Sequence, residues 1–303
     1  MNKINWYPGH MAKARRLLAE QLSRVDLVVE LCDARLPYSS RNPDLDRMLG
    51  GRKRILLLNK ADLADPAVTS RWLKHFRNGG ETVDAVDSRH LKTADVIRLI
   101  EKGTREAVER AAARGMKKTV RVMIAGVPNV GKSTFINRLR GSGIAETGDK
   151  PGVTKSQQWV KISPWMELLD TPGLLWPRLE DQIAARRLCY LGAVRDEVVD
   201  QEELALRLLE ELAEIRPDSL RDRFHANPDL RGEALLESVC RGRGFLLKGS
   251  VPDYTRGCAV ALDEFRAGRL GRITLEEPEI PGKAERQGSS DESGREVPEP
   301  DRV

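Results

Sequence analysis

A glycine-containing stretch at residues 126–133 has the composition and spacing of a phosphate-binding loop. It reads Gly-Val-Pro-Asn-Val-Gly-Lys-Ser, matches GxxxxGK[ST], and lies between the apolar run Val120–Ala125 and a helical pattern that begins near Lys132. The glycines let backbone N–H groups surround phosphates, Lys132 can reach the β- and γ-phosphates, and Ser133 can bind Mg²⁺. The full match in this context disfavours an empty strand-to-helix turn. We expect nucleotide contacts from Asn129, Val130, Gly131, Lys132, Ser133 and Thr134.

Two segments that follow this loop could sense the γ-phosphate. Asp170-Thr171-Pro172-Gly173 ends an apolar run, so the Asp170 carboxylate can hold Mg²⁺ through water, and the Gly173 N–H can reach the γ-phosphate. A DxxG sequence by itself is often only a strand-to-turn transition, but its position about 40 residues after a phosphate loop favours the functional interpretation. In the polar stretch Gly141–Gln158, Thr154 is the candidate second Mg²⁺ ligand, and the alternative is an ordinary loop threonine.

A second motif predicts the base. Asn59-Lys60-Ala61-Asp62 closes the apolar run Ile55–Leu58, and the Asp62 carboxylate can accept hydrogen bonds from guanine N1–H and the 2-amino group. Adenine offers neither donor there, so the motif indicates GTP or GDP over ATP. Alone, it could be a charged strand end. The next strand ends in Asp87-Ser88, whose backbone N–H groups are the weaker candidates for a further base contact.

The order of these motifs is reversed relative to most GTPases, because Asn59 precedes Gly126 by 67 residues. A permuted chain can build the same site when its strands still assemble in the same places. A consequence is that the Asp170–Gly173 segment leads directly into the C-terminal part, so that a nucleotide-dependent change there could reorient that part.

Around the motifs, short apolar runs alternate with helical patterns, which predicts an α/β fold with a mainly parallel sheet. The expected strands are Val25–Asp33, Arg54–Lys60, Thr82–Ser88, Val120–Val127, Gln158–Ile162 and Glu167–Asp170, and the expected helices are Ala12–Leu22, Pro66–Arg77, Thr93–Ala113 and Lys132–Arg140. After about Trp176 only amphipathic helical patterns follow, at Asp181–Leu191, Glu202–Ile215, Arg231–Arg241 and Thr255–Ala267.

These patterns divide the 303 residues into a basic arm and helix (1–24), a nucleotide-binding domain (25–177), a small all-α domain (178–273) and a disordered acidic tail (274–303). The whole chain has a net charge of +5 and the tail a charge of −5, so residues 1–273 carry +10. Such a positive charge fits a polyanionic partner. No apolar run is long enough to span a membrane, and we expect a cytoplasmic protein. The four cysteines lack zinc-site spacing and are expected to be reduced and mostly buried.

Four features resemble the circularly permuted GTPases, and among them the bacterial group that assembles the large ribosomal subunit. They are the opening Trp6–Met11, the element Asp33-Ala34-Arg35-Leu36-Pro37, the permuted pair of motifs at 59–62 and 126–133, and Asp170–Pro177. The resemblance covers about residues 3–273. It implies a GTPase whose helical domain contacts rRNA, a late precursor of the large (50S) subunit as partner, and, we expect, a monomer.

Leu174 stands where many GTPases carry the glutamine that orients the attacking water. The resemblance implies compensation by K⁺ at Asn129, with His10 a further candidate for hydrolysis. His10 could equally bind rRNA, because the first sixteen residues combine Lys3, Lys13, Arg15 and Arg16 with Trp6 and Tyr7 and hold no acid. A segment packed on the nucleotide domain is the structural alternative.

Three other functions stay open at this point. The first is an ATP-dependent kinase or ATPase, which the Asn59–Asp62 motif disfavours. The second is a guanine-nucleotide sensor or RNA-binding switch without significant turnover, which Leu174 keeps open. The third is an organellar relative, although no Arg- and Ser-rich leader precedes Trp6.

Overall fold

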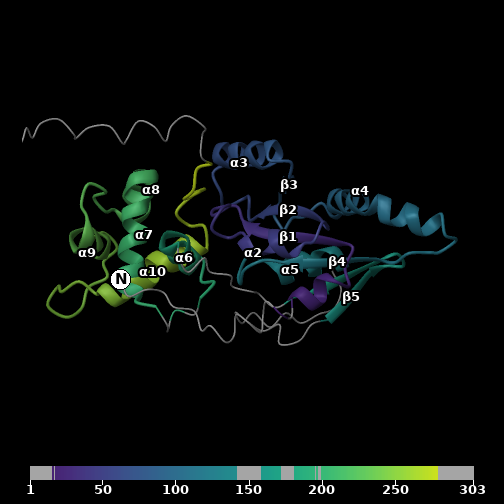
Figure 1. Ribbon diagram of the computed structural model, residues 1–303. Helices are drawn as coiled ribbons and strands as arrows, with labels where there is room; N and C mark the ends of the chain where they lie inside the picture. Colours follow the sequence, from purple (N-terminus) through teal and green to yellow (C-terminus); the bar gives the residue numbers. More distant parts are fainter. Residues whose placement is uncertain are drawn as a thin grey trace, which may run out of the picture.

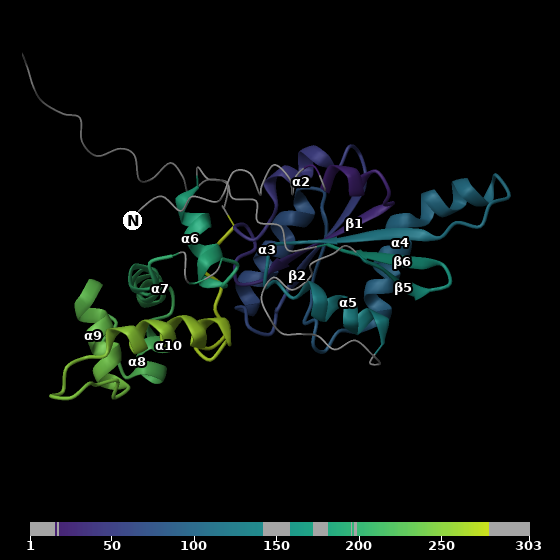
Figure 2. The same ribbon diagram turned by 90° about the horizontal axis from the view of Figure 1, so that it is seen from below.

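A computed structural model describes residues 16, 18–141, 158–171, 181–194, 196 and 199–278, with the backbone alone at Asp44, Asp46, Gln158 and Asp170. An α/β domain built on one sheet lies beside a domain made of helices (Figures 1 and 2). The fold confirms the predicted α/β class with a following all-α domain.

The strands of the sheet stand in the order β3-β2-β1-β4-β6-β5. All neighbouring pairs are parallel except β5 and β6, which are antiparallel. Val29 on β1 lies opposite Ile55 on one side and Ile124 on the other. Central strands of a parallel sheet are buried on both faces, which explains why most of their residues are apolar. The strands are β1 (Leu27–Asp33), β2 (Lys53–Asn59), β3 (Thr82–Ala85), β4 (Val120–Ala125), β5 (Gln158–Ser163) and β6 (Met166–Asp170).

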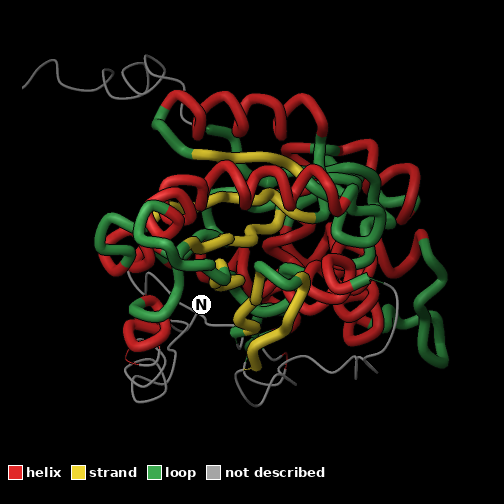
Figure 3. The backbone as a smooth tube through the Cα atoms, turned by 90° about the vertical axis from the view of Figure 1, so that its right-hand side faces the viewer, coloured by secondary structure: helices red, strands yellow, loops and turns green. Residues whose placement is uncertain are grey.

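Helices cover both faces of the sheet (Figure 3). Leu27, Val29 and Leu31 pack with residues of α4 and α5 on one face, whereas Val28 and Cys32 join the cores on the other. The opposite face is covered by a short helical stretch at residues 18–22 and by α2 and α3. These helices are α2 (Pro43–Met48), α3 (Pro66–Asn78), α4 (Thr93–Ala112) and α5 (Lys132–Arg140).

The helical domain packs around its own core, which includes Leu208, Leu212, Leu236 and Phe265 and also takes in Leu36 of the sheet domain. Its elements are α6 (Gln182–Tyr190), α7 (Gln201–Ile215), α8 (Pro217–Phe224), α9 (Gly232–Gly242) and α10 (Tyr254–Arg266). Neither α2 nor α8 was expected, since each has fewer than nine residues and shows too little periodicity.

After α10 the chain returns to the sheet domain. The Ile273 N–H donates to the Leu63 carbonyl (3.0 Å) and the Leu275 N–H to the Arg35 carbonyl (3.0 Å). Glu276 is 5% exposed and accepts from the Tyr38 N–H (2.7 Å). Residues 274–278, which the sequence groups with the tail, therefore lie against the sheet domain, and 279–303 lie outside the described residues.

The four cysteines are buried free thiols, as expected, and burial raises the pKa of Cys189 and of Cys258 to about 12. In the described part of the chain no helix is long and apolar enough to cross a bilayer.

Candidate nucleotide site

The parallel strands end at one edge of the sheet, and the predicted motifs gather there. Asp33 and Asn59 are the last residues of β1 and β2 and are paired in register. The loop of residues 126–131 follows β4, and Ser88 follows β3. Ligands of open α/β sheets bind at this edge, so the chain brings both motifs together although Asn59 comes first.

The phosphate loop needs its two glycines. Gly126 has φ +154° and Gly131 has φ +98°. A Cβ at Gly126 would lie 2.5 Å from the Leu31 carbonyl oxygen, and one at Gly131 would lie 2.5 Å from Asn59 Nδ2. The loop therefore packs tightly against β1 and β2, and only glycine allows this approach.

Lys132 begins α5 directly after Gly131 and is 8% exposed. Its ammonium group donates to the carbonyl oxygens of Gly126 (3.0 Å) and Val127 (2.8 Å). Ser133 and Thr134 are exposed in the first turn of the same helix. The loop thus presents a buried cation and hydroxyl groups at a helix N-terminus, the arrangement that suits a phosphate chain.

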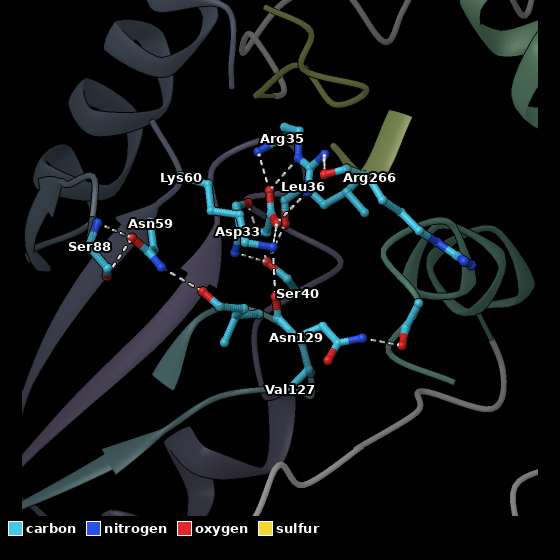
Figure 4. A network of polar contacts seen from close by, with 12 residues as sticks. Asp33, Arg35, Leu36, Ser40, Asn59, Lys60, Ser88, Val127, Asn129 and Arg266 are labelled. Atoms are coloured by element: carbon cyan, nitrogen blue, oxygen red, sulfur yellow. Dashed lines mark hydrogen bonds and ion pairs between the residues drawn. The ribbon is translucent and has the colours of Figure 1, made fainter. Parts of the chain in front are cut away.

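Asn59 joins three segments of the site (Figure 4). Its Nδ2 donates to the Val130 carbonyl (2.6 Å), and its Oδ1 accepts from the Ser88 N–H (3.0 Å) and the Ser88 hydroxyl (2.7 Å). One buried side chain thereby fixes the phosphate loop relative to the turn after β3. Asn59, Ser88 and Val130, all predicted site residues, are brought together.

Lys60 and Asn129 connect the two motifs further. Lys60 Nζ donates to the Asn129 carbonyl (2.6 Å) and lies 3.0 Å from Asp33 Oδ2. Burial lowers the pKa of Lys60, and the Asp33 charge opposes this shift. Asn129 Nδ2 donates to the Gly192 carbonyl (2.5 Å) just after α6, so the phosphate loop also contacts the helical domain.

The two carboxylate oxygens of Asp62 differ in their contacts. Its Oδ2 is paired with the Arg89 guanidinium, while its Oδ1 is buried and accepts no hydrogen bond from any described residue. A buried acceptor without a donor is costly, and guanine N–H groups would satisfy it.

The Asp87 carboxylate contacts residues of the turn that it belongs to. It accepts from the Arg89 N–H (2.9 Å) and lies 2.7 Å from His90 Nδ1. Burial would raise the pKa of Asp87, but the contacts with His90 and the Arg89 N–H outweigh it and lower the pKa. Its predicted base contact therefore concerns the backbone of this turn and not the carboxylate.

Several predicted residues lie outside the described residues, namely His10, Thr154, Gly173 and the side chain of Asp170. The Asp170 backbone is paired with Ile124, two residues before Gly126. The next residue, Thr171, is buried and donates its hydroxyl hydrogen to the Ile124 carbonyl (2.6 Å). The end of β6 thus lies beside the start of the phosphate loop. The described residues contain no cluster of three or more His, Cys, Asp or Glu side chains that could hold a metal.

Sequence reasoning gave no role to Asp33, Arg35 or Arg89. Asp33 is fully buried and pairs with Lys60 and with the Arg35 guanidinium. A carboxylate that closes a mainly apolar strand, followed two residues later by an arginine, was the signal that could have revealed the first two. Arg89 directly follows the Asp87-Ser88 turn, a position that indicated proximity to the base.

Comparisons with known proteins agree with this geometry. The profile of the family described as "50S ribosome-binding GTPase" matches residues 121–221. Ribosome biogenesis GTPase A of Bacillus cereus is 41% identical over 282 residues, which cover 91% of this chain and 94% of that protein.

Two solved structures of YlqF from Thermotoga maritima, one bound to GDP and one to GNP, are 28% identical to the chain and cover 88% of it. Their TM-scores are 0.66 and 0.62, and the chain covers 100% and 99% of them. With this likeness over nearly the whole length, and with both nucleotide motifs at one sheet edge, the chain belongs to the ribosome biogenesis GTPase A family and is a GTPase.

Proposed function

We propose that this GTPase acts in late maturation of the large (50S) ribosomal subunit, binding its rRNA in the triphosphate state and leaving after hydrolysis. The observation that carries the nucleotide part is the contact of Asn59 Nδ2 with the Val130 carbonyl (2.6 Å), which joins the predicted base motif to the phosphate loop. The ribosomal part is supported by the description of the matching family and by the name of the Bacillus relative. The +10 charge of residues 1–273 supports a polyanionic partner.

The residues at the phosphate end fit Mg²⁺. Ser133 is exposed beside Lys132, and the end of β6, where Asp170 stands, is adjacent to β4. Ser133, Thr154 and, through water, Asp170 would hold the ion, and the Gly173 N–H would contact the γ-phosphate. When bound, Mg²⁺ neutralises charge that develops on the β- and γ-phosphates.

Asn129 fits the proposed K⁺ site. Because its Nδ2 donates to the Gly192 carbonyl, the orientation of the amide is fixed, and its Oδ1 is left to act as a ligand. An amide oxygen suits a hard cation such as K⁺.

Hydrolysis by the isolated protein should be slow, because Leu174 cannot orient the attacking water. We propose that docking on the subunit supplies the orientation of the water that Leu174 cannot give, through the 141–158 segment and His10. The family membership removes the ATP-dependent alternative and disfavours a nucleotide sensor without significant turnover. We expect the protein to work as a cytoplasmic monomer.

The test is GTP turnover by the purified protein with increasing amounts of large ribosomal subunits, at several salt concentrations and in K⁺ or Na⁺. We expect stimulation that falls as salt rises, because contacts with rRNA phosphates release counterions. Lys132→Ala should abolish turnover in every condition. A rate that subunits leave unchanged would contradict the assembly function, and equal stimulation in Na⁺ would remove only the K⁺ site.

A further inference from the structure

Asp33 and Arg35 lie between the nucleotide motifs and the helical domain (Figure 4). We propose that both are positioning residues of the nucleotide site: they hold Lys60 against the phosphate loop and make nucleotide affinity depend on how α10 is docked. This inference rests on the proposed nucleotide site.

The buried Arg35–Asp33 ion pair is bidentate and reaches the helical domain. Arg35 is 2% exposed, and its Nε and Nη2 donate to the two Asp33 carboxylate oxygens, each at 2.9 Å. Its remaining Nη1 donates to the Phe265 carbonyl (2.7 Å) and the Arg266 carbonyl (3.3 Å) at the end of α10. The guanidinium also lies 5.0 Å from the centre of the Phe265 ring. Arg35 thus contacts Asp33 and the helical domain at once.

Two cations, Arg35 and Lys60, share the Asp33 carboxylate. Asp33 is fully buried, and its Oδ2 contacts both Arg35 Nη2 and Lys60 Nζ. Without the Arg35 side chain, the buried carboxylate would keep only the backbone N–H of residue 35 (3.1 Å) and the Lys60 ammonium among these partners. The ammonium, then the one charged partner of the two, would be drawn away from the Asn129 carbonyl that it now holds at 2.6 Å. Arg35 therefore acts on the phosphate loop without touching it.

The contacts form a closed path that begins and ends at Asn129. From the Asn129 carbonyl they run through Lys60, Asp33 and Arg35 to the end of α10. There the Arg266 guanidinium donates to the carbonyls of Cys189 and Tyr190 at the end of α6. Two residues later, the Gly192 carbonyl accepts from the Asn129 side chain.

Any coupling through this path is reciprocal, because linked binding and docking equilibria must affect each other equally. If docking of α6 and α10 orders Asn129 and Lys60 for nucleotide, bound nucleotide must favour that docking by the same factor. The path through Lys60, Asp33 and Arg35 does not include the Asp170–Gly173 segment, which leads directly into the helical domain. The helical domain would therefore sense the nucleotide by two routes.

The main test compares Arg35→Met with Arg54→Met in the full-length protein. Arg54 is a matched control, because it is also buried and paired with carboxylates, Glu30 and Glu81, but at the start of β2, at the opposite edge of the sheet. Both variants should lower the unfolding temperature. Only Arg35→Met should weaken GDP and GTP binding in titration calorimetry, by about ten- to hundredfold, the range expected for loss of one charged hydrogen bond.

A double-mutant cycle tests whether Arg35 acts through Lys60. Lys60→Met should weaken nucleotide binding, and adding Arg35→Met to it should change the affinity by less than about twofold. Arg35→Lys keeps the charge but cannot donate to both Asp33 oxygens and to α10 as the guanidinium does, so it should give an intermediate affinity.

If Lys132→Ala and Lys60→Met both keep wild-type affinity, the nucleotide site itself is wrong. If they weaken binding but Arg35→Met matches Arg54→Met, or its effect adds fully to that of Lys60→Met, the positioning role is wrong.

Hydrogen exchange on the wild-type protein gives a test that depends on no variant. GDP should slow exchange of backbone amides at residues 190–193 and 265–269, on both sides of the domain contact, beyond any change at the ends of α8 and α9. Equal exchange at 190–193 and 265–269 with and without GDP would overturn the proposed coupling.

Discussion

The substitution Asp62→Asn tests the base site with almost no change of shape. In the proposed base site the carboxylate would accept the two guanine N–H donors, and its Oδ1 accepts no hydrogen bond from the described residues. The amide in Asp62→Asn keeps one acceptor oxygen, so one charged hydrogen bond of about 1.5–3 kcal/mol is lost and a buried donor is left unpaired at about 1–3 kcal/mol. Together these losses should weaken GDP binding by roughly 10²- to 10⁴-fold. The fold should survive, because the pair with Arg89, which is 60% exposed, adds little stability.

The asparagine amide group presents a donor where guanine also has one, whereas xanthine carries an acceptor oxygen at that position. Asp62→Asn should therefore bind xanthosine diphosphate more tightly than GDP, which is measured by titrating both nucleotides. Asp84→Asn is the matched control, since that carboxylate stands on β3 and accepts from the Ala85 N–H. Unchanged GDP affinity and base preference in Asp62→Asn would refute the assignment of the base site.

Three further substitutions give separate tests. Gly131→Ala would place a Cβ 2.5 Å from Asn59 Nδ2, so nucleotide affinity measured by calorimetry should fall at least about tenfold; Gly141→Ala, with φ +86° and nothing within 4 Å, should bind normally. Arg89→Ala should reduce guanine affinity by no more than about fivefold, as expected for an exposed pair, and an increase in affinity would contradict its support of Asp62. Burial alone would raise the pKa of Asp33, but Arg35 and Lys60 outweigh it and hold the pKa well below the ordinary value. The stability that Asp33 contributes is thus present above its unfolded-state pKa, near 4, and is lost as pH falls further. Acid unfolding of Asp33→Asn should depend less steeply on pH below about 4 than that of the wild type, and equal slopes would count against the ion pair.

The sheet and both nucleotide motifs could be predicted because their causes are local. The central strands β1 and β2 are buried on both faces along most of their length and so read as mainly apolar runs. The glycines at 126 and 131 are required by the backbone of the phosphate loop itself. The permuted order did not hide the site, because strands assemble at the same edge whatever their order along the chain.

Long-range contacts were beyond the reach of sequence patterns. Arg35 contacts carbonyl groups 230 and 231 residues away, and nothing in the local sequence names that partner. Glu276 begins a strongly acidic, proline-containing sequence, yet its carboxylate accepts from Tyr38 and Ser39. Burial raises the pKa of Glu276, and the contacts with Ser39 and Tyr38 oppose that shift.

The short helix α8 follows α7 almost directly and begins with Pro217, which suits a helix start.

Whether the nucleotide in this pocket controls docking on the ribosome is tested most directly by co-sedimentation with large ribosomal subunits. The wild type should sediment with subunits in a non-hydrolysable GTP analogue and remain in solution with GDP. Asp62→Asn should need the matching xanthosine triphosphate analogue and should not respond to the GTP analogue. Sedimentation that is equal in GTP analogue and GDP, or an Asp62→Asn variant that still responds to guanine nucleotide alone, would contradict the account.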